Sequence, residues 1–173
     1  MNRINKLFEN RKEKILSVYF TAGYPGLNDT LSIIRELDKS GVDMIEIGMP
    51  FSDPVADGPV IQRSSERSLK NGMTLSLLFE QLSALREITD IPLILMGYIN
   101  PVFRYGVEEF LGKCRETGID GTIIPDLPVE EFKESYESLF TRYNILNIFL
   151  VSPQSPRERI LYLDRISSGF LYI

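Results

Sequence analysis

The sequence contains no histidine and one cysteine, Cys114. Without histidine, any acid–base chemistry has to use carboxylates, tyrosine, lysine or that cysteine. Zinc sites that depend on histidine are excluded, because a single cysteine cannot replace those ligands. Cys114 also cannot form an internal disulfide, which favours a reducing compartment, and we expect a cytoplasmic protein.

Long apolar runs and clusters of basic residues are absent as well. The longest apolar runs fall well short of the roughly 18 residues that cross a bilayer. The charged segment 1–14 lacks the apolar core of a signal peptide. A net charge of −5 argues against a nucleic-acid-binding surface. We therefore expect a globular protein that binds neither membrane nor nucleic acid.

Short apolar segments alternate with longer amphipathic ones along the chain. The apolar segments are rich in β-branched and aromatic residues and are mostly apolar on both faces, which is typical of strands in a parallel sheet. They predict six strands at 15–20, 43–49, 91–98, 119–124, 145–151 and 169–173. Helical patterns lie between them, and an extra helix is predicted at 2–13. We expect one domain over residues 1–173.

This alternation fits either an α/β (β/α)8 barrel (TIM barrel) or a doubly wound open sheet. The turn at 21–26, TAGYPG, lacks the G-x-G-x-x-G spacing that usually follows the first strand of the open sheet. The barrel is therefore favoured. The interval between the second and third strands is nearly twice the usual one, and such an insertion indicates a functional loop.

A charged residue, Glu46, interrupts the second predicted strand. Side chains alternate between the faces of a strand, so Met44, Glu46 and Gly48 share one face. Glu46 should point into the barrel near the carboxyl end of its strand, where this fold carries active sites. A glutamate in that position can serve as a general acid or base. The structural alternative is a glutamate paired with a cation or with loop amides.

The loop after this strand, 50–59, carries the carboxylates Asp53 and Asp57 among three prolines. Aspartate, proline, glycine and serine are also ordinary turn formers, so a plain surface turn is the alternative. Its place directly after Glu46 favours function, because Asp57 could reach a ligand bound over the glutamate.

The segment 46–62, EIGMPFSDPVADGPVIQ, resembles the signature of tryptophan synthase α subunits. Further segments agree in order and spacing at 19–26, 95–106, 118–131 and 169–173. The resemblance implies a (β/α)8 barrel and the retro-aldol cleavage of indole-3-glycerol phosphate to indole and glyceraldehyde 3-phosphate, a lyase reaction of tryptophan biosynthesis. It implies no cofactor in this chain. A β subunit that holds pyridoxal phosphate would take up the indole in an α2β2 complex.

The resemblance also assigns roles. Glu46 matches the residue that transfers protons, and Asp57 the one that binds the indole N–H and stabilises the cationic ring. Matches to the substrate pocket wall, each of which could instead be plain barrel core, are Phe20, Met96, Tyr98, Ile123, Pro125, Leu150 and Tyr172. Matches to the surface that faces the β subunit are Asp53, Asn100 and Pro101, and Asp126 matches a residue that organises the loops.

The family's barrel has eight βα units, and this chain ends inside the sixth strand. We therefore expect a C-terminally incomplete barrel without the segments that hold the substrate phosphate, and no cleavage by the chain alone. A noncatalytic fragment that binds the β subunit is the first alternative function. A different phosphate-binding barrel enzyme is the second, although the signature at 46–62 argues against it.

Overall fold

All six predicted apolar segments form strands in the computed structural model, which describes residues 1–173. The strands are β1 (Ser17–Thr21), β2 (Met44–Gly48), β3 (Leu93–Met96), β4 (Gly121–Ile123), β5 (Leu146–Leu150) and β6 (Leu171–Tyr172). They pair in parallel in the order β1-β2-β3-β4-β5-β6. An order without reversal confirms the barrel-type prediction and excludes the doubly wound sheet.

The helices follow the strands as in a series of βα units. They are α1 (Arg3–Asn10), α2 (Thr30–Lys39), α3 (Pro59–Asn71), α4 (Leu75–Gln81), α5 (Ile99–Tyr105), α6 (Val107–Thr117), α7 (Val129–Glu131), α8 (Glu137–Tyr143) and α9 (Arg157–Ile166). A 3-10 turn, Leu82–Glu87, extends α4, and a π turn, Phe132–Tyr136, joins α7 to α8. None of the helices is long and apolar enough to cross a membrane.

Helix α5 was not expected from the sequence, and α3 was indicated only by the glycine at its end, Gly72. Helix α3 occupies the long interval after β2, with Pro59 in its first turn and Gly72, in a left-handed conformation, just after its end. Its buried residues are Ser65 and Ser68, so it lacks the stripe of large apolar residues that marks an amphipathic helix. Small side chains allow α3 to lie close to β1.

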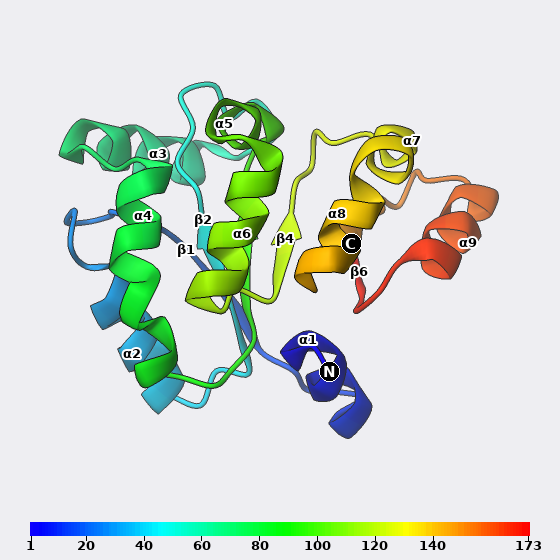
Figure 1. Ribbon diagram of the computed structural model, residues 1–173, viewed down its shortest axis with the longest axis horizontal. Coiled ribbons are helices and arrows are strands. Elements are labelled where there is room, and N and C mark those ends of the chain that lie inside the picture. Colours follow the sequence, from blue (N-terminus) through cyan, green and yellow to red (C-terminus); the bar gives the residue numbers. More distant parts are fainter.

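The two faces of the sheet bury different clusters. The outer face, with Ile45, Ile47 and Leu95, packs against the surrounding helices. The inner face contributes a smaller cluster made of Met44, Ile94, Ile123, Ile148 and, from α1, Ile4. Figure 1 shows the helices around the outside of the curved sheet and α1 at its lower end, opposite α3 and α5. The carboxyl ends of the strands therefore remain open beside α3 and α5.

Helix α1 is tied to the amino end of the sheet through Asp120, which precedes β4 and is 3% exposed. The Asp120 carboxylate accepts hydrogen bonds from Arg3 (3.1 Å), Arg86 (2.7 Å) and the backbone N–H of Leu93 (3.0 Å). The Asn2 amide donates to the Asp120 carbonyl oxygen at 2.8 Å. One buried carboxylate thus links α1, β3, β4 and the turn after α4.

We predict that Asp120→Asn destabilises the chain by about 3 kcal/mol, because it leaves two guanidinium groups without their shared anionic partner. Urea denaturation of the 173-residue chain, followed by circular dichroism, measures this. Glu116→Gln, which removes an exposed ion pair with Lys113, is the control and should leave the midpoint unchanged. An unchanged midpoint for Asp120→Asn would show that the carboxylate contacts do not hold α1 in place.

Candidate active site

Glu46 lies on the inner face of β2 and is 4% exposed. Its Oε1 accepts a hydrogen bond of 2.6 Å from the Ser17 hydroxyl on β1. No lysine or arginine forms an ion pair with it, and no loop amide donates to it. The predicted inward orientation of Glu46 is confirmed. Neither structural alternative, a paired cation or loop amides, is found.

Asp57 lies half-buried in the loop after β2. The Tyr98 hydroxyl donates to Asp57 Oδ2 at 3.2 Å and accepts from the backbone N–H of Ala56 at 2.9 Å. Burial raises the pKa of Asp57, while the Tyr98 hydrogen bond acts in the opposite direction. Tyr98 therefore holds both the loop and its carboxylate in place.

A small cavity, which we call the inner cavity, opens beside Asp57 at the carboxyl ends of β1, β2 and β3. Met96, Tyr98 and Pro125 line it together with Asp57. Phe51 from the loop after β2 completes the wall, and its ring centroid lies 5.2 Å from that of Tyr98. The structure thus brings three of the predicted wall residues together around one of the two carboxylates.

The remaining inward residues lie deeper or nearer the edge. Ile123 is fully buried in the inner cluster, and Tyr172 packs against this cluster. Burial raises the pKa of Tyr172, and the charge of Glu46 adds to the rise, which places both groups in the same interior. Leu150, paired with Tyr172 across β5 and β6, is 37% exposed because it lies near the edge of the sheet.

The predicted inward orientation of Phe20 is wrong. Phe20 packs against the outer cluster, on the same side of the sheet as Ile47. In the register of β1 with β2, Tyr19 is the partner of Glu46 and Phe20 the partner of Ile47. Because side chains alternate, Tyr19 and not Phe20 faces the interior.

Tyr19 is the wall residue that the sequence analysis missed. It lines the inner cavity, and a Cβ added at Gly48 would lie 2.2 Å from its hydroxyl oxygen, so this ring requires glycine at that position. Burial raises the pKa of Tyr19, against the effect of a hydrogen bond with Thr21, and the charges of Asp57 and Glu46 add to the rise. The signal was present in the alternation S-V-Y-F-T, whose polar members mark the inner face.

Asp126 connects two of the loops at this end of the sheet. Its Oδ1 accepts a 2.9 Å hydrogen bond from the backbone N–H of Ile99, the first residue of α5. The loop after β4 is thereby fixed to the helix that follows β3. This is an organising role of the kind the resemblance implies.

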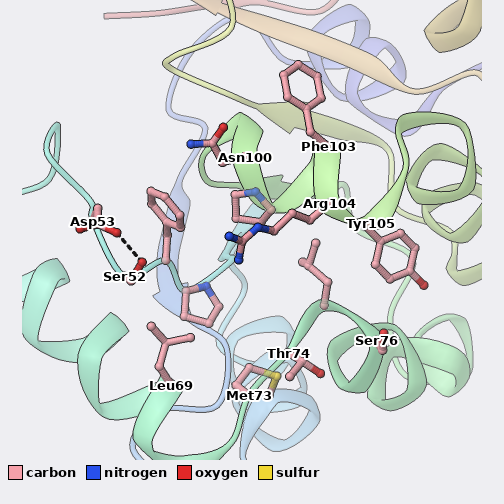
Figure 2. Close-up of a pocket in the computed structure, with 14 residues that line it drawn as sticks. Ser52, Asp53, Leu69, Met73, Thr74, Ser76, Asn100, Phe103, Arg104 and Tyr105 are labelled. Carbon is pink, nitrogen blue, oxygen red and sulfur yellow. Dashed lines mark hydrogen bonds between the residues drawn. The ribbon is translucent and has the colours of Figure 1, made fainter.

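Asp53, Asn100 and Pro101 do not line the inner cavity. They line an open groove beside it, which we call the side groove and which shares Phe51 with the cavity. Figure 2 shows Asp53 on the loop after β2, Asn100 and Arg104 on α5, and Leu69 and Met73 below them. The structure therefore separates the predicted interface residues from the predicted pocket residues.

The chain contains no group of three or more acidic or cysteine side chains placed to hold a metal ion. What the site offers is two carboxylates in different surroundings. Glu46 lies deep in an apolar interior, and Asp57 lies at the rim with a tyrosine hydroxyl. Such a pair suits proton transfer to a flat apolar ligand held between them.

Comparison with known proteins agrees with this arrangement. A family model described as tryptophan synthase alpha chain matches residues 6–173. The tryptophan synthase alpha chain of Flavobacterium psychrophilum is 60% identical over the whole of this chain, which spans 68% of that relative.

Solved structures show the same likeness. Tryptophan synthase subunit alpha from Legionella pneumophila superposes with a TM-score of 0.92 at 38% identity, over 100% of this chain and 68% of that one. A chain of the tryptophan synthase complex from Pyrococcus furiosus gives 0.86 at 39% identity, over 92% of this chain and 66% of that one. The chain therefore belongs to the tryptophan synthase alpha chain family, a lyase family of tryptophan biosynthesis.

Proposed function

We propose that this chain, as one (β/α)8-barrel domain, carries the catalytic carboxylates for the retro-aldol cleavage of indole-3-glycerol phosphate to indole and glyceraldehyde 3-phosphate. The observation that carries the proposal is the pair formed by Glu46, inside the barrel, and Asp57, at the rim of the inner cavity. A surface that only bound a partner would not need a carboxylate on the inner face of β2.

Glu46 transfers the protons. A proton delivered to C3 of the indole ring converts the ring to an indolenine cation. Removal of the proton from the glycerol hydroxyl then forms the aldehyde, and the electrons of the breaking carbon–carbon bond return to the ring. One proton is given and one is taken, so the carboxyl group ends as it began.

Asp57 accepts a hydrogen bond from the indole N–H and stabilises the cationic ring. Its charge is useful only once the ring is protonated, so it favours the transition state over the bound substrate. The hydrogen bond from Tyr98 orients it for this purpose. An apolar slot for the flat ring is formed by Met96, Tyr98, Ile123, Pro125, Leu150 and Tyr172, with Tyr19 in place of Phe20.

The side groove with Asp53, Asn100 and Pro101 binds the β subunit in an α2β2 complex. Its position supports this assignment, because it shares Phe51 with the inner cavity and so connects partner contact to the site. The Pyrococcus furiosus relative was solved as a tryptophan synthase complex. Pyridoxal phosphate belongs to the β subunit in this proposal, and this chain uses its own side chains.

The chain spans about two thirds of the length of its relatives. Activity is therefore measured on an extended chain, in which the C-terminal third of the Flavobacterium psychrophilum relative follows Ile173, and in parallel on the 173-residue chain. If the extended chain releases indole and the 173-residue chain does not, cleavage also requires the added C-terminal segment. If neither chain releases indole but a β subunit binds, the noncatalytic alternative is favoured.

In the extended chain, Glu46→Gln should lower kcat at least about a hundredfold, the scale of one acid–base group. Glutamine keeps the shape and can still accept from Ser17, so the circular dichroism spectrum should be unchanged. Glu36→Gln, which alters an exposed carboxylate on α2 that pairs with Lys39, is the matched control. Indole production by Glu46→Gln close to that of the parent would exclude proton transfer by this residue.

Asp57→Asn should lower kcat more than it raises KM, because the carboxylate charge acts on the cationic ring and hardly on the neutral indole ring of the bound substrate. Steady-state indole release at saturating and limiting substrate separates the two effects. A large rise in KM with unchanged kcat would instead make Asp57 a substrate-binding residue.

Asp57→Asn should also stabilise the fold at neutral pH. A folded-state pKa raised above that of the unfolded chain means that folding disfavours the ionised carboxylate. The favourable contribution of Asp57 is therefore present at low pH and lost as pH rises through the folded pKa. Thermal unfolding of the 173-residue chain should show a higher Tm for the variant at pH 7 and no difference at a pH well below 3.8. A lower Tm at pH 7 would contradict this.

A further inference from the structure

Ser17 is the single protein group that forms a hydrogen bond with the Glu46 carboxylate. We propose that Ser17 is a positioning residue, whose hydroxyl fixes Oε1 of Glu46 and leaves Oε2 as the oxygen that exchanges protons with the substrate. The inference rests on the proposed function of Glu46 and adds which atom reacts and what holds it.

The register of β1 and β2 gives the direction of this contact. Ser17 is paired with Met44, whereas Glu46 is paired with Tyr19, so Ser17 lies two residues closer to the amino end of the sheet. Its hydroxyl therefore draws Oε1 toward the floor of the barrel. The second oxygen, Oε2, takes no part in this bond.

Oε2 has no hydrogen-bond partner in the protein and is not enclosed. Among the buried side-chain nitrogen and oxygen atoms of the chain, the one without a partner is Gln81 Oε1. Oε2 is thus open to a ligand or to water, while Oε1 is already bonded. The two oxygens of one carboxylate differ in access, which is what a proton-transfer group at the bottom of a site requires.

Ser17 is itself held firmly. The residue before it, Leu16, accepts backbone hydrogen bonds from Asp43 (3.0 Å) and Met44 (3.2 Å), and its own N–H donates to the Asp43 carboxylate at 2.8 Å. Arg11 forms an ion pair with the same carboxylate. The start of β1 is therefore clamped to the start of β2, and the serine hydroxyl is presented from a fixed backbone.

A hydroxyl suits both protonation states of Glu46. It donates to Oε1 of the carboxylate in a short, charge-assisted hydrogen bond. When a proton resides on Oε2, Oε1 remains an acceptor and the same bond persists. The bond thus removes rotamer freedom from the glutamate throughout the reaction, and positioning of this kind is worth a measurable part of the rate.

The test uses Ser17→Ala and Ser17→Thr in the extended chain. Ser17→Ala should lower kcat about tenfold, a part of the roughly hundredfold cost of a misplaced group, with KM changed less than about twofold. Ser17→Thr keeps a hydroxyl on a β-branched side chain suited to a strand and should restore most of the rate.

Ser68→Ala is the matched control, since it removes a buried serine hydroxyl that bonds the carbonyl oxygen of Ala22 and does not touch Glu46. It should leave kcat and KM unchanged. Parental kcat in Ser17→Ala, or Ser17→Thr no better than Ser17→Ala, would overturn the positioning role. If Glu46→Gln were fully active, the proposed function would fail instead. An inactive Glu46→Gln beside a fully active Ser17→Ala removes only the role of Ser17.

Discussion

The parallel pairing of β1 with β2 determines where every polar group of the site lies. It sets Tyr19 beside Glu46 and Ser17 beside Met44, and all of these side chains share the inner face. A shift of one residue would move Glu46 among the outer helices, where Ile45 and Ile47 now pack, and would leave it buried without a hydroxyl. Gly48 belongs to the same constraint, because the Tyr19 ring occupies the space a side chain would need. The Asp43 contacts at the start of both strands keep this register in place.

The sequence predicts the sheet well because strands covered on both faces are marked by their apolar runs. All six were located, and their order follows from the regular spacing of βα units. Helix α3 was indicated only by Gly72 at its end, because its buried side is made of Ser65 and Ser68, and helical periodicity is recognised from large apolar residues. Helix α5 lies in a segment whose proline, Pro101, favours a turn when viewed alone. Tertiary contacts decide both cases, and such contacts cannot be read from local patterns.

The candidate site was likewise predicted only in part from the sequence. Glu46 was predictable, since a charge within an apolar strand has few inward alternatives in a barrel. The choice between Tyr19 and Phe20 was missed because both are aromatic neighbours, although the polar members of S-V-Y-F-T mark the inner face, and the register with β2 settles it. The separation of Asp53 from Asp57, four residues apart in one loop, depends on the Tyr98 hydroxyl, which bonds Asp57 and the adjacent backbone and leaves Asp53 on the side groove. A partner just after β3 therefore separates two aspartates that look equivalent in the sequence.

The two carboxylates also illustrate how one small site can hold two chemical roles. Asp57 is half-buried, and its raised pKa shows that the fold tolerates a charge there at some cost. Glu46 is more deeply buried, yet the Ser17 hydroxyl supports its carboxylate from below. A carboxylate at the rim suits the stabilisation of a cation, whereas a carboxylate with one bonded and one free oxygen suits the movement of a proton. Because Ser17, Tyr19 and Tyr98 are all supplied by neighbouring strands or the ends of those strands, the difference between the two roles is built into the first three strands of the sheet.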